Sequence, residues 1–218
     1  MSGEGEYYHV YNRGVDKRPI FNGLRDYQRL LLSMFSFCSQ ASFPNLARFH
    51  SFVQHSMLHT AVKEIEQITE HDPRLVTIAC FCFMPNHFHF LLKEEVAGGI
   101  SKYMQRLGNS YTKYFNTRVE RRGHLFGSSF HSIHVDRNEY LLYLSRYIHR
   151  NPEGLPLKTR DLIDYHWSSY QDLVKQNRWG KMINPAIILD QFANPKEYQQ
   201  YVESEIDEKI DPRYLLGT

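Results

Sequence analysis

Two histidines separated by one residue, His87 and His89, are the first side chains in this sequence that could do chemistry. If residues 87–93 form a strand, both imidazoles point to one face, about 7 Å apart along the chain, and Phe88 points to the other. Two imidazoles at this spacing can bind one divalent cation. A pair of polar residues on a half-exposed strand would have the same spacing, so the pattern alone favours neither interpretation.

A second group lies near residue 150, where a polar flank and an apolar stripe both recur at helical spacing. The flank consists of Tyr140, Tyr143, Tyr147 and Asn151, and the stripe of Leu141, Leu144 and Ile148. A phenol has a pKa of about 10, so it is a poor nucleophile unless cations or a base stabilise the phenolate. Tyr147 and Asn151 are one helical turn apart and could serve one site. Alternatively, the tyrosines form the edge of the core and Asn151 ends the helix before Pro152.

Two cysteines, Cys80 and Cys82, precede the histidines and allow a zinc site as a further alternative. Both lie in the apolar run TIACFCF, which favours buried free cysteines of a core. With Cys38, the chain has 3 cysteines, a small and odd number that does not suit a disulfide framework. We therefore expect a reducing, cytoplasmic environment.

Charge is distributed unevenly along a chain whose net charge is only +2. Residues 101–150 contain nine Lys or Arg and three Asp or Glu, a net +6, whereas residues 185–218 contain three and seven, a net −4. A basic stretch is typical of a surface that binds a polyanion, although a solvated face would give the same charge. The uncharged run at residues 75–92 is interrupted by Pro85 and Asn86, which indicates two buried strands and a turn. We therefore expect a soluble protein without a membrane span.

The hydrophobic pattern predicts the elements that must hold these residues. Strands are expected at residues 7–12, 75–83, 87–93 and 126–135, and helices at residues 27–38, 100–115 and 136–150. Asp136 and Glu139 resemble a capping box for the last helix. This order predicts an α+β fold, a ferredoxin-like βαββαβ sandwich with an additional C-terminal helix that carries Tyr147.

Two segments lie outside this pattern. Residues 39–73, with a helix expected at residues 61–69, are interpreted as an insertion. Residues 174–218 are interpreted as an acidic appendage of unknown function, whose acidic end at residues 203–211 is either a packed helix or a tail. The main domain is therefore expected at residues 7–173.

Five short motifs stand in order along the chain. They are YHVYNRG from Tyr8, MPNHFHFLL from Met84, RGHLF from Arg122, YIHRNP from Tyr147 and WSSY from Trp167. Together they resemble the HUH single-strand tyrosine transposases, specifically the REP-associated tyrosine transposases of the IS200-like group. The resemblance implies that His87, His89 and Asn151 bind Mg²⁺ or Mn²⁺, and that Tyr147 is the nucleophile.

The activity that the resemblance implies is nicking and strand transfer of single-stranded DNA that bears hairpins, as in transposition. Tyr147 would form a 5′-phosphotyrosine intermediate, and no nucleotide cofactor would be needed, because the covalent bond conserves the energy of the phosphodiester. Candidates for contacts with DNA are Tyr8, Arg13, Arg118, Arg121, Arg122, Arg146 and Arg150. Lys102, Arg106 and Lys113 are weaker candidates.

Two rival functions stay open on the sequence alone. A DNA-hairpin-binding protein derived from such an enzyme would hold the substrate without cutting it. A zinc hydrolase would use Cys80, Cys82, His87 and His89 together. The sequence also leaves open whether the chain forms a homodimer, and whether the tyrosine helix serves its own subunit or a partner.

Overall fold

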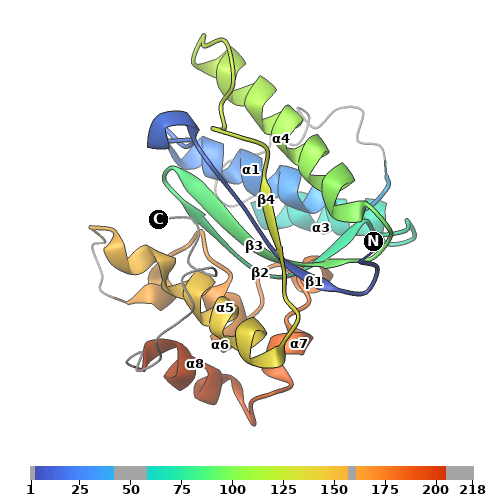
Figure 1. Cartoon of the computed structure of the whole chain (residues 1–218), viewed down its shortest axis with the longest axis vertical. Coiled ribbons are helices and arrows are strands. Elements are labelled where there is room, and N and C mark those ends of the chain that lie inside the picture. The colour runs from blue at the N-terminus through green and yellow to red at the C-terminus, as the bar shows by residue number, and fades with distance from the viewer. Residues whose placement is uncertain (1–2, 42–57, 157–160, 205–218) are drawn as a thin grey trace.

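Figure 1 shows a computed structural model of the chain, which describes residues 3–41, 58–156 and 161–204. Four strands form one antiparallel sheet in the order β2-β3-β1-β4. They are β1 (Tyr7–Arg13), β2 (Val76–Met84), β3 (His87–Glu94) and β4 (His131–His134). Helix α1 (Leu24–Ser36) lies between β1 and β2 in sequence, and helix α4 (Gly99–Arg118) between β3 and β4. This order is that of a ferredoxin-like βαββαβ fold, so the predicted fold class is confirmed.

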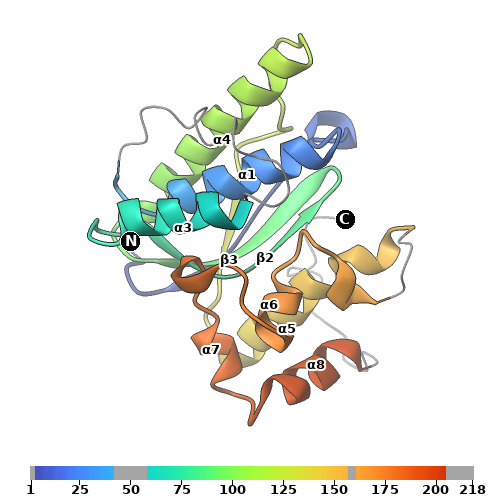
Figure 2. The same cartoon turned by 180° about the vertical axis from the view of Figure 1, so that it is seen from behind.

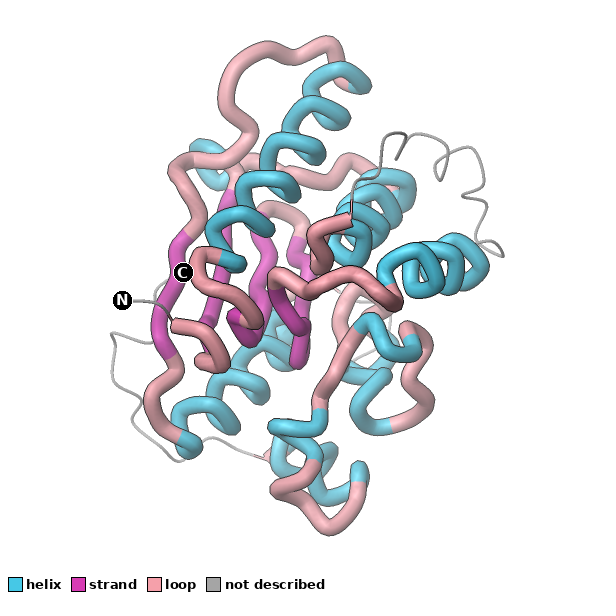
Figure 3. Tube along the Cα trace, turned by 90° about the vertical axis from the view of Figure 1, so that its right-hand side faces the viewer, coloured by secondary structure: helices cyan, strands magenta, loops and turns pink. Residues whose placement is uncertain are grey.

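Helices cover both faces of the sheet, as Figures 1 and 2 show from opposite sides. One face carries α1, α4 and α3 (Leu58–Thr69). The other carries α5 (Asn138–Arg150), α6 (Tyr170–Val174), α7 (Ala186–Leu189) and α8 (Pro195–Glu203). Short 3-10 turns lie at Val15–Lys17, Asn151–Gly154, Leu162–Asp164 and Gly180–Met182. Figure 3 shows the strands as a layer between these helices. None of the helices among these residues is long and apolar enough to cross a membrane.

The alternation of side chains along β3 divides the core into two parts. Phe88 and Phe90 pack in the cluster shared with α1 and α4, whereas Leu91 packs in the cluster shared with α5. The helix contributes Leu144 and Ile148, both fully buried, to this second cluster. At about 25 cal/mol per Å² of apolar area, each such side chain contributes on the order of 2 kcal/mol. The apolar stripe of α5 therefore fixes which flank of the helix faces the histidine side of β3.

Two local predictions are wrong. The predicted strand at residues 126–135 is shorter, because Phe126 makes a single bridge to Gly14 and the chain then leaves β1 until His131. The capping box is also absent: the N-cap of α5 is Arg137, and no side chain caps it. Asp136 is exposed and pairs with Arg137 at 3.6 Å instead. A competing ion pair between exposed neighbours therefore replaces the expected cap.

The segment interpreted as an insertion lies partly outside the described residues, at 42–57. Its described part contains α3, which packs against α1 on the outer side of that layer. At the other end of the chain, α8 packs against α5 and α6. Of the acidic end, residues 205–211 lie outside the described residues.

Candidate active site

The two histidines lie on β3, an inner strand flanked by β2 and β1. Because the strand alternates, His87 and His89 face α5 while Phe88 packs on the other side. The imidazole centroids are 5.0 Å apart and the rings are perpendicular. His89 is fully buried and His87 is half-buried. The pair is therefore held by the sheet, with one ring open toward the surface.

Helix α5 brings its tyrosine and asparagine to these rings. The Tyr147 ring meets the His89 ring edge-on, with centroids 5.4 Å apart. The Asn151 Oδ1 lies 3.2 Å from His87 Nε2. Asn151 Nδ2 donates to the Tyr147 carbonyl at 2.9 Å, which fixes the orientation of the amide. The structure thus brings together all four residues to which the motif resemblance assigns the chemistry.

A second amide fixes the orientation of His87. Asn86 Nδ2 donates to the Lys17 carbonyl at 2.9 Å, so Asn86 Oδ1 faces His87 Nδ1, at 2.6 Å. The neutral ring has one N–H, and the shorter contact indicates that Nδ1 donates it to Asn86. His87 Nε2 then presents a lone pair toward the lone pairs of Asn151 Oδ1. Two electron-pair donors that face each other in this way suit a cation between them.

His89 has a corresponding support from β1. Its Nδ1 lies 2.8 Å from His9 Nε2, in a fully buried contact between imidazoles. Among the described residues, His89 Nε2 is buried and has no hydrogen-bond partner. If His89 donates through Nδ1, this Nε2 carries a free lone pair. His87 Nε2, His89 Nε2 and Asn151 Oδ1 therefore form a donor set that fits a divalent cation.

Burial sets the protonation of this site. It lowers the pKa of His87 to about 4 and that of His9 to about 3. The pKa of His89 lies well below its usual value, because the ring is fully buried beside His9 and His87. All three imidazoles are therefore neutral near pH 7. Burial also raises the pKa of Tyr147, although Asn151 and Arg13 act in the opposite direction. Forming the phenolate thus requires further positive charge at the site.

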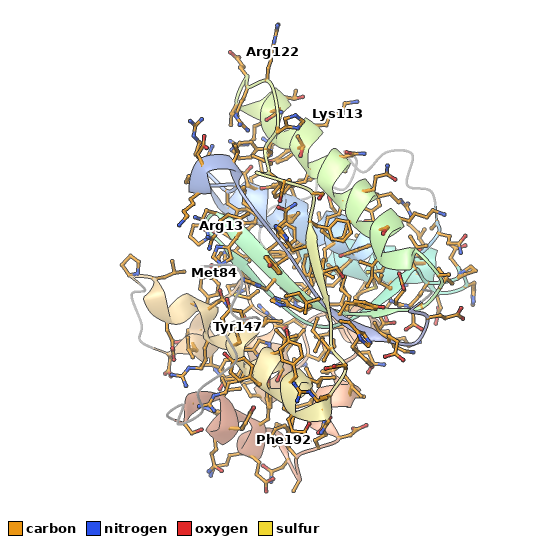
Figure 4. All side chains as sticks on the ribbon, viewed as in Figure 1. Arg13, Met84, Lys113, Arg122, Tyr147 and Phe192 are labelled. Atoms are coloured by element: carbon orange, nitrogen blue, oxygen red, sulfur yellow. The ribbon has the colours of Figure 1, made fainter. Side chains whose placement is uncertain are left out.

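An open cavity of about 390 Å³ adjoins the histidines. Arg13 and Lys17 line it together with His87 and His89. Arg13 is the register partner of His87 across β1 and β3. Figure 4 shows Arg13 and Tyr147 on neighbouring elements in this part of the molecule. The cavity therefore places the cationic side chains of Arg13 and Lys17 beside the two histidines of the donor set, with the Asp16 carboxylate also in its lining.

The other predicted DNA contacts are not gathered at this cavity. Arg118 pairs with the buried Asp26 at 2.6 Å, and the Tyr8 ring lies tilted against His134 with centroids 5.2 Å apart. Arg121 donates to the His124 carbonyl at 2.6 Å, and Arg122 is exposed at the far end of the loop after α4, as Figure 4 shows. Of the weaker candidates, Arg106 binds the carbonyls of Ser39 and Ala41 at 2.7 and 2.6 Å, while Lys102 and Lys113 are exposed on α4.

Arg146 and Arg150, also predicted to bind phosphates, bind the end of α8 instead. Both guanidinium groups donate to the Ser204 carbonyl, Arg150 at 2.7 Å. Arg150 further pairs with Glu153 at 2.7 Å. Cations at the carboxyl end of a helix are favourable, because unpaired carbonyls carry partial negative charge there. In this structure the two arginines hold α5 against α8 and do not line the cavity.

The two cysteines of the zinc alternative lie on the histidine face but deep in the core. Cys80 and Cys82 are fully buried in the cluster that includes Leu91. Burial raises the pKa of both thiols well above the usual value, so they are protonated rather than thiolate. No group of three His, Cys, Asp or Glu side chains that could hold a metal occurs in the part of the chain that the structure describes. The donor set of His87, His89 and Asn151 is not such a group, because its third member is an amide.

Sequence reasoning missed His9 and Asn86 as supports, although both lie inside quoted motifs. Strand alternation places His9 on the same face of β1 as Tyr11, and Asn86 directly precedes His87. The missing information was the register, which pairs Tyr11 with His89 and so brings His9 alongside it.

Comparison with known proteins agrees with the motifs. Residues 47–151 match the family model of IS200-like transposases. This match confirms the resemblance to IS200-like transposases that the five motifs indicate. A solved structure, described as the "Structure of the REP associates tyrosine transposase bound to a REP hairpin", is similar to this chain at 13% sequence identity and a TM-score of 0.48. The similarity covers 84% of this chain and 87% of that chain. No curated protein matches the chain in sequence.

Proposed function

We propose that this protein is a transposase that nicks single-stranded DNA bearing hairpins and transfers the cut strand through Tyr147. The observation that carries the proposal is that Asn151 Oδ1 lies 3.2 Å from His87 Nε2, while the Tyr147 ring contacts His89, whose buried Nε2 has no partner among the described residues. The choice of hairpin DNA as substrate follows the motif resemblance. The domain that does this chemistry is proposed to span residues 7–173, with residues 174–218 as an appendage.

His87, His89 and Asn151 would hold Mg²⁺ or Mn²⁺, which when bound polarises a phosphate and neutralises its charge. Neutral imidazoles and an amide oxygen carry no negative charge, so they would leave the positive charge of the cation free to interact with the phosphate. Asn86 would keep His87 in the tautomer that presents Nε2, and His9 would do the same for His89 when it accepts from His89 Nδ1. Arg13 contributes a guanidinium at the mouth of the cavity, where it attracts and orients the strand.

The Tyr147 oxygen attacks the scissile phosphorus, and the bond from phosphorus to the 3′-oxygen breaks. The phenol loses its proton to solvent, and the leaving oxygen takes up a proton to become a free 3′-hydroxyl. The products are a 5′-phosphotyrosine and a free 3′ end. Attack on this phosphotyrosine by another 3′-hydroxyl reverses the step and joins a new strand without an external energy source.

Covalent trapping tests this proposal directly. Wild-type protein is incubated with end-labelled hairpin oligonucleotides that carry single-stranded flanks, with Mg²⁺ or Mn²⁺ and in parallel with EDTA. We expect a labelled protein adduct only with the cation, and a DNA-linked peptide that contains Tyr147. Tyr147→Phe should abolish both cleavage and adduct, a loss of at least 100-fold, because the variant lacks the attacking oxygen.

Tyr143→Phe is the matched control, because its ring lies on the same helix with its centroid 6.5 Å from that of Tyr147. This variant should keep both cleavage and adduct. An adduct on Tyr143, or undiminished cleavage by Tyr147→Phe, would contradict the assignment of the nucleophile. A protein that binds the hairpins but forms no adduct with either metal would instead be a hairpin-binding protein.

A further inference from the structure

A second cavity, of about 520 Å³, lies between α4 and the loop at residues 124–130. Asn12 and Ser128 line this cavity and also the one that contains His87 and His89. Asn12 Nδ2 donates to the Ser128 carbonyl at 3.4 Å, so this hydrogen bond joins two residues that line both cavities. The two cavities therefore meet where the loop at residues 124–130 passes β1, although Phe88 places this cavity on the α4 side of the sheet and the histidines lie on the α5 side. A strand whose phosphate lies at the histidines reaches this cavity by passing over that loop.

One stripe of α4 forms the wall of this cavity. Met104, Gly108 and Thr112 follow each other at intervals of four residues, so they lie on one face of the helix. Gly108 occupies the middle of the stripe. A Cβ added there would meet no described atom within 4 Å, so packing does not demand a glycine. Glycine inside a helix is less stable than alanine, and its effect here is to leave the middle of the cavity open.

The side chains around this space have the chemistry that recognises a base. Phe126 and Phe130, both half-buried, offer aromatic surfaces. Gln105 and Asn109 are exposed amides on α4 that can donate and accept hydrogen bonds. Lys113 adds positive charge on the same helix. Aromatic faces for stacking, with amides for the edge of the base, are the usual components of single-strand recognition.

We propose that this cavity binds one unpaired nucleobase of the single-stranded flank, close to the nucleotide whose phosphate is cut. The proposal rests on the proposed function, because that function supplies the strand and its position. The base stacks on Phe126 or Phe130 and occupies the space above Gly108. The cavity thereby sets which phosphate reaches Tyr147 and selects the sequence beside the cleavage position.

The test compares Gly108→Leu, which fills the cavity, with Gly108→Ala, whose added methyl meets no described atom. Both changes are made in the Tyr147→Phe background, so that binding is measured without cleavage. The probe is a fluorescein-labelled hairpin oligonucleotide with single-stranded flanks, and a set of probes in which each flanking base in turn is replaced by an abasic site. Thermal unfolding confirms that both variants are folded.

We expect one abasic position to weaken binding to the Gly108→Ala protein roughly tenfold, the loss typical of one stacked base. Gly108→Leu should bind the intact probe roughly tenfold more weakly and show no further loss at that position, because the base is already excluded. Phe130→Ala, which removes a wall instead of filling the space, should reduce the same abasic penalty.

Equal affinity of Gly108→Leu and Gly108→Ala for the intact probe would overturn the proposal. So would the same abasic penalty in both variants. If the wild type still forms its Tyr147 adduct in either case, only the base site is refuted and the proposed function stands. If the wild type neither binds nor cleaves any hairpin probe, both proposals are contradicted.

Discussion

The buried side chain of His149 should make the stability of the fold depend on pH. The side chain lies on α5, two residues after Tyr147, and is fully buried. Its Nδ1 lies 2.7 Å from the Tyr198 hydroxyl and its Nε2 lies 3.0 Å from Ser169 Oγ, so a neutral ring can accept from one hydroxyl and donate to the other. Burial lowers the pKa of His149 from about 6.5 to about 3. The native protein therefore keeps this histidine neutral where the unfolded chain protonates it.

Acid should consequently destabilise the fold through this residue. Below pH 6.5 the unfolded chain gains a proton that the native state does not take up until about pH 3, so stability present above pH 6.5 is lost as the pH falls. One such proton corresponds to a slope that approaches about 1.4 kcal/mol per pH unit below pH 6.5, or about 2 kcal/mol in total between pH 7.5 and 5.

Urea unfolding of the wild type and His149→Gln across pH 5 to 7.5 measures this effect. The variant lacks the titrating group, so its free energy of unfolding should fall by about 2 kcal/mol less than that of the wild type between pH 7.5 and 5. Other buried histidines, such as His9, contribute to both proteins and cancel in the difference. Parallel curves for the two proteins would refute the claim that His149 is neutral in the fold.

Three further outcomes follow from the site and its surroundings. His87→Ala should weaken Mn²⁺ binding at least tenfold, measured by calorimetry, while the thermal unfolding temperature changes little, and full cleavage by this variant in EDTA would contradict the metal role. Replacing Arg121 and Arg122 with Ala should reduce the slope of log affinity against log salt concentration by about 1.4, since each phosphate contact on a single strand contributes about 0.7. An unchanged slope would show that these two arginines are only solvated surface residues. Cys38, Cys80 and Cys82 should not react with a thiol reagent at pH 8 without denaturant, because burial raises the pKa of Cys38 to about 12 and raises those of the other two as well.

The fold could be predicted because its signals are local. Two short apolar runs mark β2 and β3, and the Pro85-Asn86 turn joins them as a hairpin. Helical periodicity marks α1, α4 and α5. Once the order of elements is known, few arrangements remain, and the ferredoxin-like order is one of them. The parts that failed, the capping of α5 and the length of β4, depend on competition between exposed groups that no pattern records.

The sequence could predict those features of the candidate site that lie within a single strand or helix, but not the contacts between them. The shared face of His87 and His89 follows from strand geometry, and the turn between Tyr147 and Asn151 from helix geometry. The contact between the histidine pair and the pair of Tyr147 and Asn151 depends on tertiary structure, because it requires α5 to pack against β3. The contact between His9 and His89 joins residues 80 positions apart, so it required the register of β1 with β3.

The last helix shows why its motif combines such different residues. Tyr147 and Asn151 face the histidines. His149 contacts Tyr198 of α8 and Ser169 instead. Arg146 and Arg150 both bind the Ser204 carbonyl at the end of α8. Under the proposed function, the helix that carries Tyr147 must be held in one position, because small displacements of an attacking group are costly in a transesterification. The apolar stripe fixes the rotation of α5, and the polar anchors prevent it from sliding along the sheet. Residues 195–204 of the segment interpreted as an appendage thus help to position the Tyr147 ring.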